Sequence, residues 1–423
     1  MGGGMTSRER VRAALAHRQP DRVPVDFGSA SVSGMHATCV AALREHFGLP
    51  RRPVKMHHPY GGLGILEDDL LDALGVDTIG VFPRGTSFGF PNEDWKEVRV
   101  PWGQTVLVGA GYETSVDVNG DLLIYPQGDR GAPPSGRMPV GGYFFDTIIR
   151  QEPIDEDTLD PADNCEEFGP LSAADLAYLR GQVEGVKASD RAVVATIGGT
   201  GFGDIAAVPA PFLERPKGIR DITEWYVSLV ARPEYVEAVF ARQCDIVLAR
   251  LAQALPVLGD AVDILYVCGT DFGTQASQFC SRETFDRLWA PHYRRVNDWI
   301  HAHTSWKTFK HSCGAVEPFI SRFIEVGFDI LNPVQCSAAG MDPRGLKRAY
   351  GDRLTFWGGG VNTQRTLPFG TPEEVRAEVL ERCETFAPGG GFIFNAIHNV
   401  QANTPVANIL AMVEAVREFN GVR

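Results

Sequence analysis

The chain has 423 residues, of which 44% are hydrophobic and 22% are charged, as in an ordinary globular protein. Its formal net charge of -13 argues against a nucleic-acid-binding surface and fits an enzyme that acts on a small molecule or docks a protein partner. No apolar run reaches the ~18 residues that a membrane span needs. The charged stretch 7–12 is unlike a signal-peptide core, and the eight scattered cysteines indicate free thiols, so we expect a cytoplasmic protein.

The first 81 residues alternate between helical and strand patterns. An amphipathic helix is predicted over 6–17, and a short strand over 21–28 follows it. A second helix over 63–74 and a second strand over 76–81 complete this part.

The segment at about 82–190 breaks this rhythm. Glycine and proline are frequent there, and short stretches alternate between apolar and polar residues. Asn119-Gly120 is a strong hairpin turn between 115–118 and 121–125. The pattern predicts a β-rich insertion after the second strand.

Strand and helix patterns alternate again after residue 190. Strands are predicted at 192–197, 263–268, 306–310, 329–332, 354–357 and 391–394, with helical segments at 219–254, 283–303, 315–326 and 372–386. Eight strands in all predict an α/β fold, a (β/α)8 TIM barrel that occupies 1–423 as one domain with the insertion.

Polar residues follow several of these strands, at the end where a barrel binds its substrates. They include Asp271, Asn332, Gln335, Asn362 and Asn395. The four amides are candidates for substrate binding, although loop amides also satisfy backbone groups. Asp271 could act as a base, orient a ligand, bind a substrate cation or cap a turn.

A more specific signal is the pair His311 and Cys313 at one strand end. Residues two apart on a strand point to the same face, and imidazole with thiolate is a ligand set that zinc prefers. His398 offers a third ligand, and Cys336 is its rival. The alternative is a buried histidine that is hydrogen-bonded to the backbone beside an inert thiol.

Four motifs together resemble the uroporphyrinogen decarboxylase superfamily, which also contains cobalamin-dependent methyltransferases. They are the helix with Asp-Arg-Val-Pro over 8–24, His-Ser-Cys-Gly at 311–314, Phe-Trp-Gly-Gly-Gly-Val-Asn-Thr at 356–363, and the closing 398–408. Uroporphyrinogen decarboxylases carry an Arg-Gln-Ala-Gly-Arg signature after the first strand, where this chain has 26–31 without arginine. Because those arginines bind substrate carboxylates, we expect no porphyrinogen decarboxylation.

The resemblance implies a zinc site of the methyltransferase branch. That branch uses a His-x-Cys pair, matched here by His311 and Cys313, and a later cysteine, where this chain has His398. This departure implies either a His/Cys/His site or the loss of the metal. A His/Cys/His site would leave zinc more positive than a site with two thiolates. This charge suits activation of an ether, alcohol or amine-type methyl donor.

From these observations we expect a zinc-dependent methyltransferase that moves a methyl group between a small methylated substrate and a corrinoid cofactor on a partner protein. His311, Cys313 and His398 would hold zinc, and Asp271 and His398 are the catalytic candidates. The substrate-binding candidates are Asn332, Gln335, Asn362 and Asn395. We expect no nucleic-acid or membrane partner, and an oligomer is compatible with the sequence.

Two alternatives stay open from the sequence. One is a metal-free decarboxylase or related lyase in which His398 and Asp271 act as acid and base. The other is a non-catalytic binding subunit of a methyl-transfer complex.

Overall fold

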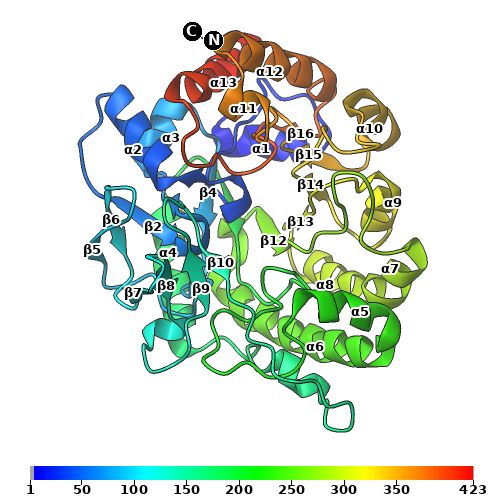
Figure 1. Cartoon of the computed structure of the whole chain (residues 1–423). Helices are drawn as coiled ribbons and strands as arrows, with labels where there is room; N and C mark the ends of the chain where they lie inside the picture. Colours follow the sequence, from blue (N-terminus) through cyan, green and yellow to red (C-terminus); the bar gives the residue numbers. More distant parts are fainter. Residues whose placement is uncertain (1–3, 423) are drawn as a thin grey trace.

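The structure, a computed structural model, describes residues 4–422. A curled parallel sheet of seven strands forms its centre, in the order β16-β15-β14-β13-β12-β11-β4, with helices outside it (Figure 1). The strands are β4 (Thr78–Val81), β11 (Ala192–Ala195), β12 (Ile264–Cys268), β13 (Lys307–His311), β14 (Ile330–Asn332), β15 (Thr355–Trp357) and β16 (Phe392–Ile393).

The segment around Val25 lies between the two edge strands β16 and β4. Val25 forms a parallel bridge with Phe394, and the Asp77 N–H donates to the Val25 carbonyl at 2.8 Å. The strand predicted over 21–28 is therefore reduced to one bridge, because Pro24 has no N–H to donate and Gly28 turns the chain at a φ of +86°. The closed circle of seven strands and this segment is compatible with a (β/α)8 barrel.

Side chains that alternate along the strands fill the inside of the sheet. This inner cluster contains Val194, Ile264, Phe309, Ile330, Trp357 and Ile393. Helix α1 (Ser7–Leu15), capped by Thr6, adds Val11, Ala14 and Leu15 to the same cluster. The helix thereby closes the amino-terminal end of the sheet, and polar side chains are left for the carboxyl-terminal end.

Three aspartates repeat one contact at the amino-terminal end. Asp77, Asp263 and Asp329 each stand one residue before a strand of the central sheet. Each carboxylate accepts the backbone N–H of a neighbouring strand or segment, from Val25 at 3.0 Å, Val193 at 2.8 Å and Thr308 at 2.9 Å respectively. These bonds satisfy backbone donors at the ends of the strands.

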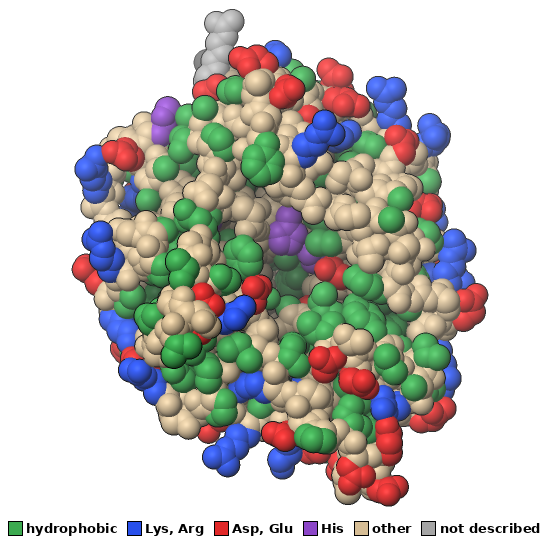
Figure 2. Space-filling model, viewed as in Figure 1, with side chains coloured by type: hydrophobic (Ala, Val, Ile, Leu, Met, Phe, Trp, Pro, Cys, Tyr) green, Lys and Arg blue, Asp and Glu red, His purple; other side chains and the backbone are tan. Residues whose placement is uncertain are grey.

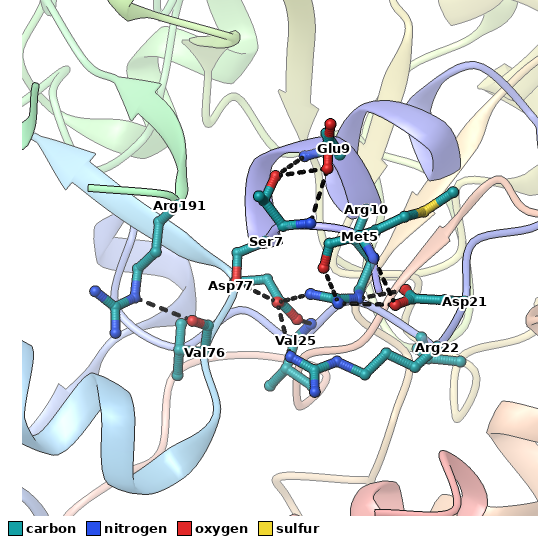
Figure 3. A network of polar contacts seen from close by, with 12 residues as sticks. Met5, Ser7, Glu9, Arg10, Asp21, Arg22, Val25, Val76, Asp77 and Arg191 are labelled. Carbon is teal, nitrogen blue, oxygen red and sulfur yellow. Dashed lines mark hydrogen bonds and ion pairs between the residues drawn. The ribbon is translucent and has the colours of Figure 1, made fainter. Parts of the chain in front are cut away.

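Figure 3 shows how one of these aspartates joins α1 to the sheet. The carboxylate of Asp77 accepts bonds from the Arg10 guanidinium at 2.6 Å and the Ser7 hydroxyl at 2.7 Å. Arg10 also binds both carboxylate oxygens of Asp21, at 2.7 and 3.0 Å. Because Arg10 and Asp77 are both buried, loss of either would leave the other with only its second ion pair, Arg10 with Asp21 or Asp77 with Arg22.

Helices cover the outside of the sheet (Figure 1). They are α2 (Ala37–His46), α3 (Asp68–Leu74), α4 (Ala173–Val186), α5 (Ile222–Ala231), α6 (Pro233–Leu258), α7 (Arg282–Leu288), α8 (Ala290–His303), α9 (Glu317–Glu325), α10 (Pro343–Tyr350), α11 (Thr366–Phe369), α12 (Pro372–Phe386) and α13 (Val406–Phe419).

Two predicted helices differ from these bounds. The helix predicted over 63–74 begins only at Asp68, because Leu63–Gly64 forms strand β3 and pairs with β1 (Met35–His36) and β2 (Val54–His58). The helix predicted over 283–303 is two helices, α7 and α8, that meet at Trp289. Pro291 lacks the N–H that a continuous helix would need there.

Between β4 and β11 the chain forms short, mainly antiparallel strands. They are β5 (Lys96–Arg99), β6 (Thr105–Val108), β7 (Thr114–Val116), β8 (Leu122–Ile124), β9 (Gly136–Met138) and β10 (Asp146–Thr147). Asn119-Gly120 lies in the turn of the β7–β8 hairpin, where Val116 pairs with Leu122.

Two further findings concern the whole described chain. No helix within residues 4–422 combines the length and apolar character required to cross a membrane. The eight cysteines are all free thiols.

Candidate metal centre

Three side chains that are distant in sequence converge at the carboxyl-terminal end of the sheet. The possible ligand atoms of His311, Cys313 and His398 all lie within 4.8 Å of one another. His311 ends β13, and His398 follows β16, which lies three strands away along the sheet. The centres of their two rings are nevertheless only 5.2 Å apart. Figure 2 shows histidine atoms at the centre of the hollowed face. Curvature of the sheet brings these residues together.

A hydrogen bond to Asn332 orients the His311 ring. The His311 Nδ1 lies 2.5 Å from the Asn332 Oδ1, and the Asn332 amide nitrogen donates to the Trp357 carbonyl at 2.8 Å. With the amide fixed in this orientation, Nδ1 of His311 carries the proton. Its Nε2 lone pair then faces the other two side chains, in the arrangement typical of a metal-ligating histidine.

The thiol of Cys313 lies against this free nitrogen, with Sγ 3.3 Å from the His311 Nε2. Burial, above all, and the nearby Asp271 carboxylate raise the pKa of Cys313 well above its ordinary value. Without a cation the sulfur therefore keeps its proton and can donate it to Nε2. A metal ion would take the place of that proton, because it stabilises the thiolate.

Both imidazoles are neutral at physiological pH. Burial lowers the pKa of His311 to about 4, and it also lowers the pKa of His398. A neutral imidazole is the form that binds a metal. Two imidazole nitrogens and one sulfur form a donor set that fits zinc and leaves a fourth position open for substrate.

Two loops cross closely beside this centre. A Cβ on Gly314 would lie 2.4 Å from the backbone of Gly273, and Gly314 adopts a φ of +85°. The Asp271 Oδ1 accepts the Cys313 N–H at 2.7 Å, and the Ser312 hydroxyl accepts the N–H of Phe272 at 2.9 Å. The His-Ser-Cys-Gly motif thus supplies two of the three candidate ligands, His311 and Cys313, and the close contact between the two loops that holds them in place.

Asp271 lies at the edge of the centre. Its Oδ1 is 4.0 Å from the His311 Nε2, and its side chain is 24% exposed. Since the His311 ring is neutral, this contact is no ion pair. The second carboxylate oxygen remains available to a ligand at the mouth of the sheet.

The four amides occupy different positions, which the sequence could not separate. Asn332 is fully buried, and both ends of its amide have protein partners, so its place is behind His311 and not against a substrate. Gln335 is also buried, and its Oε1 accepts the Gly314 N–H at 2.8 Å. Both amides therefore make internal hydrogen bonds, and their contact with a substrate stays a prediction.

The other two amides keep unused hydrogen-bonding groups. The Oδ1 of Asn362 accepts the N–H groups of Gln364 and Arg365, while the amide nitrogen has no partner among the described residues. The amide nitrogen of Asn395 donates to the Asp26 carbonyl at 2.7 Å. Its Oδ1 is buried and has no partner within residues 4–422.

Cys336 does not join the three converging side chains. Its sulfur donates to the Val334 carbonyl at 3.3 Å, and burial raises its pKa to about 12. The cluster of possible ligand atoms found within residues 4–422 contains His398 and not Cys336.

Sequence reasoning missed Asp204 and Tyr266. A Cβ on Gly269 would lie 2.6 Å from the Tyr266 hydroxyl and 3.1 Å from the Asp204 Oδ2, so both oxygens flank this glycine. Burial raises the pKa of Asp204 to about 6, and Asp271 adds to the rise. Tyr266 lies two residues after Ile264 on β12 and, like Ile264, packs against the inner cluster. The two-residue repeat of a strand could have identified this inward position from the sequence. Asp204 lies in a loop that has no such pattern.

The chain is similar to several known proteins. Residues 209–419 match the family described as uroporphyrinogen decarboxylase (URO-D). Uroporphyrinogen decarboxylase from Coxiella burnetii (strain Dugway 5J108-111) is 29% identical over 89 residues, which are 20% of this chain and 24% of that protein. Its counterpart from Herminiimonas arsenicoxydans is 34% identical over 94 residues, 21% of this chain and 25% of that protein.

A solved structure is similar over nearly the whole chain. A methyltransferase from Methanosarcina mazei superposes with a TM-score of 0.55 at 16% identity, covering 98% of this chain and 99% of that one. At this identity the likeness shows a shared fold. Over residues 209–419 the chain belongs to the uroporphyrinogen decarboxylase family. The stretches that match the two decarboxylases span about a quarter of those proteins.

Proposed function

We propose that this protein is a zinc-dependent methyltransferase that moves a methyl group between a small methylated substrate and a corrinoid held by a partner protein. The observation that carries the proposal is the convergence of His311, Cys313 and His398, with ligand atoms within 4.8 Å of one another. The fold shared with a methyltransferase supports the reaction class.

In this proposal each residue has a separate task. His311 and His398 supply neutral nitrogens, and Cys313 supplies a sulfur that gives up its proton when the ion binds. When bound, zinc would polarise the atom that carries the methyl group and so improve it as a leaving group. Asn332 orients His311, and Asp271 holds the Cys313 backbone while its free oxygen faces the substrate.

In this proposal Asp204 donates a proton to the leaving group. The pKa of Asp204 is about 6, so this carboxyl can hold a proton close to neutral pH. Asn362 and Asn395 retain amide groups for orienting the substrate.

The test joins metal analysis to a transfer assay. Purified protein should contain zinc, and Cys313→Ser should lose most of it. A panel of methyl ethers and methylated amines, each isotopically labelled in the methyl group, should then transfer label to added reduced cobalamin in a zinc-dependent reaction. Protein that carries no zinc but releases carbon dioxide from a carboxylated substrate would support the decarboxylase alternative, with His398 and Asp271 as acid and base.

The assay also separates the remaining alternative. A non-catalytic binding subunit would bind zinc or substrate without transferring label under any condition. The missing arginines at 26–31 further predict that uroporphyrinogen is not a substrate.

A further inference from the structure

Lys310 is a fully buried lysine next to the metal centre. It lies on β13, directly before His311, and its side chain is 0% exposed. The ammonium donates to the carbonyls of Thr270 at 2.5 Å and His311 at 2.7 Å. Within residues 4–422 it forms no ion pair with a carboxylate.

Three aromatic rings surround the rest of this ammonium. The Lys310 Nζ lies 5.0 Å from the ring centre of Phe272, 5.8 Å from Tyr293 and 5.5 Å from Phe323. Ring faces and carbonyl oxygens attract a cation but do not neutralise it. Burying an ammonium without an ion-pair partner costs free energy, so the presence of a lysine at this position requires a reason.

The charge of Lys310 lies close to the metal centre. Its ammonium donates to the backbone carbonyl of His311, which is itself a candidate ligand. The other acceptor, the Thr270 carbonyl, belongs to the residue directly before Asp271. A fixed cation at this position acts on any ion that the ligands hold.

We propose that Lys310 supplies a fixed positive charge behind the metal centre, which limits how tightly zinc is held and keeps the bound ion electron-poor toward the substrate. This inference rests on the proposed zinc site. With ligands from two neutral imidazoles and one thiolate, bound zinc keeps a net positive charge, and the Lys310 ammonium repels it. That repulsion weakens zinc binding while it favours electron withdrawal from the atom that carries the methyl group.

The test replaces the charge with an apolar side chain of similar length, in Lys310→Met. Zinc affinity, measured by competition with a chromophoric chelator, should increase about tenfold or more as one like charge is removed at low dielectric. Methyl transfer should become slower in the same variant. A purely structural role for Lys310 would make both quantities fall.

Lys307→Met is the matched control, with the same substitution at the first residue of the same strand. Lys307 is partly exposed and is already paired with Asp329 at 2.8 Å. Its replacement should leave zinc affinity within about twofold, because solvent screens an exposed charge. Lys310→Gln removes the charge but keeps a donor for the Thr270 carbonyl, so it replaces Lys310→Met if that variant fails to fold.

The outcomes separate the inference from the function on which it rests. Wild-type protein without zinc affinity would refute the zinc site and the inference with it. A wild type that binds zinc, with Lys310 variants that bind it equally or more weakly, would refute the inference alone. Tighter zinc and slower transfer in both charge-removing variants, with an unchanged Lys307 control, is the supporting result.

Discussion

The His311 Nδ1 and the Asn332 Oδ1 lie 2.5 Å apart, on neighbouring strands of the central sheet. The bond fixes which nitrogen of the ring is free, so the orientation of one metal ligand depends on a residue that cannot reach the metal. Asn332 is also held by the Trp357 carbonyl, which leaves its amide one orientation.

Asn332→Leu should lower zinc affinity by about 10- to 100-fold, the range typical for an outer partner of a metal-bound histidine. Leucine has a similar volume, but it leaves the His311 ring free to rotate. Chelator competition measures the affinity, and thermal unfolding measures stability. Asn362→Leu is the control, because its amide contacts only its own loop. Equal affinities in both variants would show that Asn332 does not orient the ligand.

Two substitutions at His398 distinguish a metal ligand from an acid or base. His398→Ala should lose zinc and methyl transfer, whereas His398→Cys should keep zinc. The added thiolate makes the ion less electrophilic, so His398→Cys should transfer the methyl group more slowly than wild type. Unchanged metal content in both variants, with turnover lowered alike, would instead indicate acid–base chemistry without zinc.

Zinc binding should release one proton per ion near neutral pH. The pKa of His311 is about 4 and that of His398 is lowered, so both rings are already neutral, whereas the raised pKa of Cys313 keeps its thiol protonated. Affinity should therefore rise about tenfold for each pH unit between roughly pH 6.5 and 8, and fall as pH decreases. Calorimetry in buffers of different ionisation enthalpy counts the protons. His398→Cys should release about two protons per zinc ion, because it has a second thiol. A count near two in wild type would contradict the assignment of one thiol and two imidazoles as its ligands.

Gly314→Ala should destabilise the protein and disrupt the centre. The new methyl group would lie 2.4 Å from the Gly273 backbone, and the φ of +85° disfavours any side chain. Gly340→Ala is the matched control, since its φ of +77° is similar but its nearest neighbour would be 3.9 Å away. Urea unfolding should show a loss of about 1–2 kcal/mol for the control and more for Gly314→Ala. Equal losses would mean that the crossing of the two loops adds no constraint.

The sequence predicted the parts of the fold that follow a simple period. The strands predicted at 306–310 and 329–332 match β13 and β14 to within one residue, and the shared face of His311 and Cys313 follows from the two-residue repeat of a strand. The first strand is reduced to one bridge at Val25, since Pro24 and Gly28 interrupt it. A bridge of this kind is held by contacts with Phe394, which lies far away in the sequence.

The roles of the individual polar residues were harder to predict. Asn332 and Asn395 each follow a strand, but only the fold determines that one amide is fully satisfied and the other is not. Asp204 reaches the site from a loop without a periodic pattern. Lys310 stands where the outward face of a strand predicts an apolar residue, and its aromatic surroundings come from three separate segments.

The three aspartates at the amino-terminal end have a consequence for engineering. Asp77, Asp263 and Asp329 fasten the strand starts at the end opposite the metal centre, together with Arg10 and helix α1. The contacts that stabilise the strands and the residues proposed for the chemistry thus lie at opposite ends of the same sheet. Libraries that randomise the loops after the strands should therefore change substrate preference while the anchored end preserves the scaffold. Changes at Asp77 or Arg10 should instead lower the yield of folded variants without altering substrate preference.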